Sequence, residues 1–412
     1  MRSIEQTVSN PQSLLTQNQS QQQIIDASSN TKTIALFSPL YLPSMGGVET
    51  YTGNLAKALF NLGWNPVIIT MNTHDMPTVQ DAAGIQVIRL PCVPTLHGRY
   101  PLPCHNIEYR NLLSNLKKQN IDYVVVNTRF YPLSYEGLAF SRSKNITPIL
   151  IEHGSAHLTI GGSFISKGVE AIEHIMTMLD KRHHPICYGV SKKSSNWLSH
   201  FNIQSHGELP NAIDADTFVD SASTRNFREE LRISDDELLV AFAGRLISEK
   251  GAFRMAQAMD ILAANKTPIH AIMAGIGPLE KEIAARHCRT LHLVGRLDRS
   301  DLAALLDQAD ILCLPSRSEG FATTLLEAAA FGTPAVVTNV GGTDELIPDE
   351  RFGTLILDAK PTTIAAALTK AHHQRSHITK QGGNVARRVR QLCSWAHTAQ
   401  LVIDACEQAQ EK

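Results

Sequence analysis

Two glutamates stand eight residues apart in the stretch SEGFATTLLEAAAFGTP, which covers residues 318–334. Glu319 precedes a Gly-Phe-Ala turn, and Glu327 lies inside an Ala-rich segment that favours a helix. One carboxylate can accept hydrogen bonds from two neighbouring hydroxyls, so the pair suits a polyhydroxylated ligand. The alternative is a capping acid followed by a surface acid. A charge among small apolar residues is costly unless it is exposed or paired, which favours ligand binding.

The turn between the two glutamates could bind phosphate. Gly320 permits a sharp turn, and the helix is expected to begin near Ala322. The first amides of a helix have no partner within it and attract anions. Here these amides belong to Phe321, Ala322, Thr323 and Thr324. Phosphate at the helix tip, ribose beside Glu327 and a sugar beyond the turn together describe a nucleotide-sugar.

Two other loops could also meet an anion. GRLISEKG (244–251) follows an apolar strand and offers Arg245 and Lys250, which suit a diphosphate, although they could be solvated surface cations. Gly46-Gly47 opens a predicted helix at 48–62 and would let a ligand approach the backbone, or would simply form a turn. This loop is not G-x-G-x-x-G, and no acid occupies the dinucleotide position, so a nicotinamide enzyme is not favoured.

The elements that must position these residues alternate between strands and helices. Continuous apolar runs at 121–128 and 147–154 are typical of buried parallel strands, and a second strand–helix series begins near residue 236. This pattern predicts an α/β protein with two Rossmann-like domains, whose parallel sheets face a central cleft. We predict a disordered polar leader at 1–31, a first domain at 32–206, a linker at 207–227, a second domain at 228–393 and a C-terminal helix at 394–412.

The C-terminal helix has two possible positions. It could cross back onto the first domain, or it could simply complete the second domain, and the sequence leaves both open.

Composition narrows the class of protein. The 412 residues are 43% hydrophobic and 19% charged, and the formal net charge of −1 gives no reason to expect a nucleic-acid partner. The seven cysteines are scattered without a C-x-x-C pair, which argues for a reducing compartment and against a disulfide framework or a zinc cluster. No apolar run is long enough for a transmembrane helix or a signal peptide.

The order of the motifs resembles that of retaining GT-B glycosyltransferases, specifically glycosyltransferase family 4 (glycosyltransferase group 1). The similar pieces are GGVETYTGNLAKAL, VSKKSSNWL, LPNAIDADTF, FAGRLISEKGAFRMAQAM, AGIGPLEKEI, LVGRL and SEGFATTLLEAAAFGTPAVVTNVGGTDELI. The resemblance runs from about residue 33 to about residue 397. It is most specific in the second half, where E-x7-E and G-R-x4-K-G agree, and looser in the first half.

The resemblance implies four catalytic residues. Arg245 and Lys250 resemble the pair that neutralises the diphosphate leaving group. Glu319 resembles the acid that contacts the transferred sugar near its reacting end. His153, in the sequence IEHG, resembles the histidine beside the donor sugar and the acceptor, whereas on its own it would be read as a structural or surface histidine.

The resemblance also implies a set of residues that bind the nucleotide-sugar. Glu327 would bind the ribose, Arg296 would lie where the base is bound, and the glycine loop at 46–47 would close over the phosphates. The full set is Gly46, Gly47, Gly244, Arg296, Gly320, Phe321, Ala322, Thr323, Thr324 and Glu327. Ala212 and Ala322 replace residues that are commonly glycine, so the backbone there is expected to be less open.

The implied activity is transfer of a hexose from a UDP-, GDP- or ADP-sugar to a hydroxyl of a glycan or lipid-linked acceptor. Such an enzyme would serve cell-surface polysaccharide, lipopolysaccharide or glycolipid synthesis in the cytoplasm, with peripheral contact at the inner membrane face. No cofactor and no metal are expected to be required, because the D-x-D-like DAD at 214–216 falls in a linker turn. Acceptor recognition is expected at 92–110 and 155–184.

Two alternatives use the same scaffold. A nucleotide-sugar 2-epimerase would convert the donor without an acceptor. A non-catalytic subunit that binds sugar-nucleotides would neither hydrolyse nor transfer the sugar.

Overall fold

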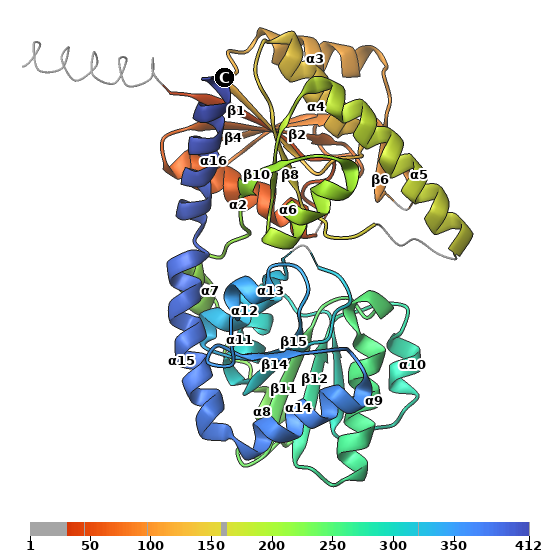
Figure 1. Cartoon of the computed structure of the whole chain (residues 1–412), viewed down its shortest axis with the longest axis vertical. Helices are drawn as coiled ribbons and strands as arrows, with labels where there is room; N and C mark the ends of the chain where they lie inside the picture. Colours follow the sequence, from red (N-terminus) through yellow and green to blue (C-terminus); the bar gives the residue numbers. More distant parts are fainter. Residues whose placement is uncertain (1–30, 45, 97, 158–162, 320, 412) are drawn as a thin grey trace, which may run out of the picture.

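The computed structural model describes residues 31–411 except 45, 97, 158–162 and 320. The leader expected at 1–31 lies outside the described residues apart from Thr31. Two α/β domains are stacked along the long axis of the molecule, the first above the second in Figure 1. The predicted α/β class with parallel sheets is confirmed.

The sheet of the first domain is parallel except at one edge. Its described strands are β1 (Thr33–Phe37), β2 (Asn65–Met71), β3 (Val79–Ala82), β4 (Ile85–Leu90), β7 (Tyr123–Asn127), β8 (Ile149–Glu152), β9 (Ile186–Gly189) and β10 (Ser205–Glu208). They lie in the order β10-β9-β8-β7-β1-β2-β4-β3, and only the β3–β4 pair is antiparallel. The strand order reverses beside β1, so the carboxyl ends of β1, β7 and β8 border the crevice where such sheets bind ligands.

Helices and a small hairpin complete the first domain. The helices are α2 (Gly47–Asn61), α3 (Ile107–Lys118), α4 (Pro132–Ser143), α5 (Ser163–Asp180) and α6 (Lys192–Leu198), with 3-10 turns η1 (Lys181–His183) and η2 (Ser199–Phe201). The hairpin pairs β5 (Cys92–Thr95) with β6 (Tyr100–Pro103). It lies within 92–110, a proline-rich segment whose pattern predicted no strands.

The β1–α2 unit shows how the sequence sets the crevice. The apolar run of β1 is fully buried and places the next loop at the sheet edge. α2 ends at Asn61 and is followed by Gly63, whose φ of +84° favours glycine, and Trp64 N–H donates to Leu59 O across the end of the helix. Tyr51 and Leu55 on the inner face of α2 are fully buried against the sheet.

The second domain has a wholly parallel sheet. Its strands are β11 (Leu238–Ala243), β12 (Ile269–Ala274), β13 (Leu291–Gly295), β14 (Ile311–Leu314), β15 (Ala335–Thr338) and β16 (Thr354–Ile356), in the order β13-β12-β11-β14-β15-β16. Its helices are α8 (Phe227–Leu231), α9 (Ala252–Ala264), α10 (Glu280–Ala284), α11 (Arg299–Gln308), α12 (Thr323–Phe331), α13 (Thr343–Leu346), α14 (Pro361–His373) and α15 (Arg375–Leu392), with the 3-10 turn η3 (Ser248–Lys250). The strand order reverses between β11 and β14, so a ligand is expected beyond the carboxyl ends of these two strands.

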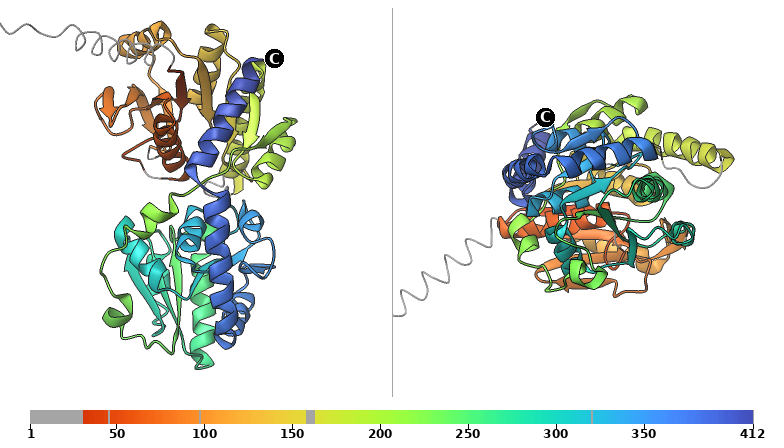
Figure 2. Two further views of the ribbon diagram at one scale, coloured as in Figure 1. Left: turned by 90° about the vertical axis from the view of Figure 1, so that its left-hand side faces the viewer. Right: turned by 90° about the horizontal axis from the view of Figure 1, so that it is seen from below.

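The last helix, α16 (Trp395–Gln410), packs on the first domain. Figure 2 shows it leaving the second domain and running beside α2. The Trp395 ring lies edge-on to Tyr51 at 5.4 Å, and Gln410 Nε2 donates to Thr147 O at 3.1 Å. Crossing back, rather than completing the second domain, is therefore the arrangement in this structure.

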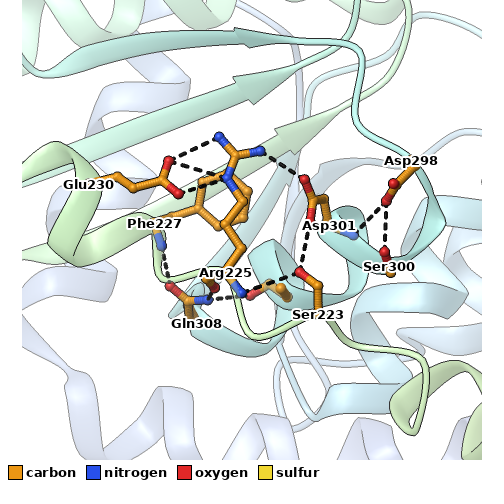
Figure 3. Close-up of polar contacts among 9 residues, drawn as sticks. Ser223, Arg225, Phe227, Glu230, Asp298, Ser300, Asp301 and Gln308 are labelled. Atoms are coloured by element: carbon orange, nitrogen blue, oxygen red, sulfur yellow. Dashed lines mark hydrogen bonds and ion pairs between the residues drawn. The ribbon is translucent and has the colours of Figure 1, made fainter.

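The linker is held by polar contacts. Asp214 caps the short helix α7 (Ala215–Val219), accepting from Thr217 N–H, and Asp216 pairs with Arg390 at 3.0 Å. Both carboxylates of the DAD segment thus have structural partners. Farther along, Arg225 bridges Glu230 and Asp301 at 2.9 Å each and fastens the linker to α11 (Figure 3).

None of the described helices combines the length and the apolar character needed to cross a membrane. All seven cysteines are free thiols.

Candidate active site

A cavity of about 700 Å³ lies between the domains, at the carboxyl ends of β8 and β11 and beside the loop after β14. The first domain contributes His153 and Ser155 to its lining, and the second contributes Arg245, Lys250 and Glu319. Ser155 Oγ donates to Glu319 O at 2.6 Å, so the two linings touch. The structure therefore gathers into one cavity all four residues that were predicted to be catalytic.

An ion pair forms the second-domain floor of this cavity. Lys250 Nζ lies 2.5 Å and 2.6 Å from the two oxygens of Glu319, and Ser316 Oγ donates to Glu319 Oε1 at 2.9 Å. The Glu319 side chain is only 11% exposed. Gly251 fixes the position of Lys250: its φ is +71°, and a Cβ there would lie 2.2 Å from Pro315 O.

The pairing of Lys250 with Glu319 was not foreseen. Sequence reasoning placed them at different parts of a ligand, the lysine at the diphosphate and the acid at the sugar. The structure shows instead that the two charges are in direct contact with each other. Arg245 differs, because its exposed guanidinium makes no ion pair with the part of the chain that the structure describes. Its positive charge is available to an anion entering the cavity.

The turn before α12 is close to the predicted geometry. Ala322 is the N-cap, and Thr323 and Thr324 form the first turn, so their amides are at the helix tip. The Phe321 ring packs against Gly342, where an added Cβ would lie 2.1 Å from the ring. Gly320, also predicted as a binding residue, lies outside the described residues.

Glu327 lies one turn farther along α12. It is half-buried, and burial raises its pKa to about 7, while the charge of Arg299 lowers it. A carboxylate with few polar neighbours has spare acceptor capacity. This environment is consistent with a site for ligand hydroxyls, and it makes the charge of Glu327 sensitive to pH near neutrality.

His153 follows β8 on the first-domain side of the cavity. Its Nε2 lies 2.9 Å from Asn127 Oδ1, and its ring meets Tyr51 edge-on at 4.8 Å. Burial lowers the pKa of His153 to about 3, so the imidazole is neutral at physiological pH. Because Tyr51 also contacts Trp395, α16 supports the wall that holds this histidine.

The glycine loop at the start of α2 contains an acid that sequence reasoning missed. Gly46 is the N-cap in extended backbone, and a Cβ on it would lie 2.4 Å from Glu49 Oε2. A Cβ on Gly47 would meet open space. Glu49 is 8% exposed, and burial raises its pKa. The E of GGVE was the available signal, since an acid in the first turn of a helix often folds back over the N-cap.

The remaining two predicted residues lie at strand ends. Gly244 follows β11 with a φ of +158°, and a Cβ on Gly275 would lie 1.9 Å from Gly244 O, so the β11 and β12 loops are in close contact. Arg296 is exposed just after β13 and does not line the cavity between the domains.

Sequence reasoning also missed a buried charge cluster behind the first-domain wall. Arg129 Nε lies 2.5 Å from Glu152 Oε2, and Arg129 Nη2 lies 2.6 Å from Glu173 Oε1. All three residues are no more than 5% exposed. Glu152 also accepts from Gly154 N–H at 2.6 Å, so the cluster holds the loop that carries His153. Charges near the ends of two adjacent apolar runs were the available signal.

Family comparisons agree with this two-domain site. The description "Glycosyltransferase Family 4" matches residues 45–216, and "Glycosyl transferases group 1" matches residues 223–388. Together the two matches cover most of the chain. The chain belongs to glycosyltransferase family 4. The first match covers the first domain, the second covers the second domain, and both describe a transferase.

Its relatives have diverged widely in sequence. An uncharacterized glycosyltransferase of Methanocaldococcus jannaschii is 24% identical over 88% of this chain and 95% of its own length. A human protein that forms part of phosphatidylinositol N-acetylglucosaminyltransferase is 22% identical over 90% of this chain and 75% of its own length.

Solved structures share the GT-B fold. Sucrose-phosphate synthase from Thermosynechococcus elongatus superposes with a TM-score of 0.69 at 20% identity, covering 92% of this chain and 98% of that one. The Anabaena protein HepE in complex with UDP-glucose superposes with a TM-score of 0.65 at 15% identity, covering 91% and 99%.

Proposed function

We propose that this family 4 glycosyltransferase moves a hexosyl unit from a nucleotide diphosphate sugar to a hydroxyl group with retention of anomeric configuration. The observation that carries the proposal is the Lys250–Glu319 ion pair, which lies in the cavity between the domains beside His153 and Arg245. A cation to receive a leaving diphosphate and an acid to orient a sugar thus stand within hydrogen-bonding distance of each other.

The chemistry requires stabilisation of a leaving group. Breaking the anomeric C–O bond leaves an oxocarbenium-like sugar and places growing negative charge on the diphosphate. Arg245, Lys250 and the amide groups at the tip of α12 are suited to stabilise that charge where it develops. Because these groups supply positive charge, the proposed mechanism requires no metal ion at the phosphates.

Lys250 and Glu319 would bind different parts of the donor beside the bond that breaks. The ammonium of Lys250 has three donors, so it can keep a hydrogen bond to Glu319 while it donates to a phosphate oxygen. Glu319 then fixes the lysine and accepts from a sugar hydroxyl. We propose front-face attack, in which an oxygen of the leaving phosphate takes the proton of the acceptor hydroxyl. The neutral His153 contributes a hydrogen bond rather than a charge.

Two of the comparisons support the donor that we propose. HepE was solved in complex with UDP-glucose, and the human relative is named for N-acetylglucosaminyl transfer. We therefore propose a UDP-sugar as the first donor to test, ahead of GDP- and ADP-sugars. Glu327 would accept from the ribose hydroxyls, as the sequence resemblance implies.

The acceptor would enter past an aromatic surface in the first domain. Tyr100 stacks near Phe130 and Tyr131, with ring centroids 5.8 Å and 5.3 Å away, and all three line the cavity. Aromatic faces pack well against the apolar faces of sugar rings. We propose a glycan or lipid-linked acceptor that is used in surface polysaccharide or glycolipid synthesis, with the enzyme at the cytoplasmic membrane face.

Two assays test this function. Thermal unfolding is measured with UDP-glucose, UDP-N-acetylglucosamine, GDP-mannose and ADP-glucose, since a ligand of the native state raises its stability. The best donor is then incubated with a panel of glycan and lipid-linked acceptors, and the product anomer is determined by NMR. The expected result is a retained glycoside. An isomerised donor formed without acceptor would support an epimerase, and binding with neither hydrolysis nor transfer would support a non-catalytic subunit.

A further inference from the structure

Three histidines meet beside the first-domain wall of the cavity, although they come from three separate segments. His157 lies in the loop after β8, His174 in α5 and His200 in η2. One ring nitrogen from each lies within 4.8 Å of the others. The Nε2 atoms of His157 and His200 are 3.1 Å apart. Trp197 stacks on the His200 ring at 4.7 Å with an interplanar angle of 6°, which limits rotation of that imidazole.

A carboxylate lies next to His157. Glu170 Oε1 lies 3.3 Å from His157 Nε2. Glu170 and His174 are four residues apart on α5, so they share one face of that helix. Zinc bound tetrahedrally to nitrogen or oxygen at 2.0–2.1 Å requires ligand atoms about 3.3–3.4 Å apart. The two separations to His157 Nε2 are close to this value.

The other nitrogen of His157 is fixed by a buried acid. His157 Nδ1 lies 2.7 Å from Glu173 Oε2, and the second oxygen of Glu173 accepts from Arg129 at 2.6 Å. Because Glu173 pairs with Arg129, this buried carboxylate is an acceptor and favours an Nδ1–H group on His157. This leaves the Nε2 lone pair of neutral His157 facing the other ligands. Metal-bound histidines have this arrangement, in which a carboxylate orients the ring through its distal nitrogen.

The contact between His157 and Glu170 needs a positive charge. In the neutral tautomer that Glu173 selects, the Nε2 lone pair faces a carboxylate oxygen at 3.3 Å, and the two repel each other. The contact becomes favourable if a cation lies among the rings or if His157 carries both ring protons. A proton on His157 would involve that ring alone and would give no reason for the other two imidazoles to converge on it. A cation bound among the three rings accounts for all of them.

We propose that His157, His174 and His200 bind a divalent transition metal ion, with Glu170 as the fourth ligand and Glu173 as the residue that positions His157. Imidazole and carboxylate donors in four-coordinate geometry fit Zn²⁺ well. Four protein ligands leave no open position, so the ion would have a structural role. It would tie the loop that carries His153 and Ser155 to α5 and η2. The site is separate from the diphosphate chemistry proposed above and does not depend on it.

Metal binding is tested on the full chain after chelation and gel filtration. The protein is incubated with Zn²⁺, passed through a desalting column and analysed for metal by mass spectrometry, and the same is done with Co²⁺, whose visible absorption reports four-coordination. We expect one equivalent of metal per chain and a higher thermal midpoint with metal than without. The variants His174→Ala and His200→Ala should each lower the affinity at least tenfold, and Glu170→Gln should weaken the Co²⁺ absorption.

A matched control is available in the second domain. His270 Nδ1 and His292 Nε2 are also 3.1 Å apart, but no third histidine of the described chain converges on them. His292→Ala should leave the metal content and the Co²⁺ spectrum unchanged. Far-UV circular dichroism establishes that each variant is folded. Failure of the native protein to retain metal, or retention that His174→Ala and His200→Ala do not reduce, would overturn the proposal and leave a protonated His157 as the explanation.

Discussion

The second-domain wall of the cavity, which comprises Arg245, Lys250 and Glu319, comes from two short loops at the ends of adjacent parallel strands. The first-domain wall, which comprises the loop 153–157 and α5, is supported by segments far apart in the sequence. Arg129 joins β7, β8 and α5 in the buried cluster, and Tyr51 joins His153 to α16. One wall is thus set by local sequence, and the other by tertiary packing.

This difference has a functional meaning if the two walls serve different substrates. A donor that must be recognised in the same way by many enzymes suits a wall made of short loops with fixed spacing. An acceptor that varies suits a wall whose position depends on exchangeable packing and on loops. The following experiments test whether the two walls can be damaged separately.

The largest expected effect comes from Arg129→Ala. Removal of this guanidinium leaves the buried Glu152 and Glu173 without the cation that pairs with both, which should lower the free energy of unfolding by about 3–5 kcal/mol. Urea denaturation measures the change. Arg351→Ala is the control, because Arg351 pairs with Asp349 on the exposed surface and its removal should lower stability far less. Equal losses in the two variants would mean that the first-domain wall does not depend on the cluster.

Lys250→Ala should have the next largest effect, confined to the second-domain wall. Loss of a cation at the leaving group should lower kcat by roughly 10²–10³-fold, with unfolding much less affected than in Arg129→Ala. Steady-state kinetics with the donor selected by the thermal screen measures this. Lys360→Ala is the control, because it removes an exposed lysine that does not line the cavity. A variant of Lys250 with native kcat would contradict the leaving-group role.

Glu327→Gln should change the pH dependence of donor binding. The native pKa is raised to about 7, so Glu327 gains charge as pH rises through that value. An ionised carboxylate is the better acceptor for ribose hydroxyls, and the donor affinity should therefore rise between about pH 6 and pH 8 and then level off. The Gln variant should bind more weakly and show a flat profile. Calorimetric titration at several pH values measures both effects, and parallel profiles would assign the titration to another group.

Arg225→Ala should have the smallest effect and should leave both walls intact. Its partly exposed contacts with Glu230 and Asp301 hold the linker, as Figure 3 shows, and their loss should lower stability only slightly. Donor affinity measured by the same titration should be unchanged. A large loss of affinity would show that the linker controls how the two walls meet.

The same contrast explains what could be predicted from the sequence. The strand–helix alternation and the glycine-bearing loops predicted the α/β class and located Lys250, Glu319 and the start of α12, because each depends on a few neighbouring residues. The ion pair between Lys250 and Glu319 could not be predicted, since it depends on the parallel pairing of β11 with β14.

The first-domain wall was less predictable for a physical reason. Arg129 follows an apolar run, but Glu173 lies 44 residues farther along, in a helix, and carries no local pattern that distinguishes it from a surface ion. Only the packing of α5 against α4 brings them together. His157, His174 and His200 likewise occur at no spacing typical of a metal site, and helix geometry accounts only for the placement of Glu170 and His174 on one face of α5.

The most direct test of donor recognition concerns Glu327 and the ribose. The native protein and Glu327→Ala are titrated with the nucleoside diphosphate selected by the thermal screen and with its 2′,3′-dideoxy analogue. We predict that loss of the two hydroxyls weakens binding to the native protein by about tenfold or more but hardly affects binding to the variant, because the hydroxyls have already lost their acceptor. An equal loss in both proteins would contradict the assignment of α12 to the nucleotide.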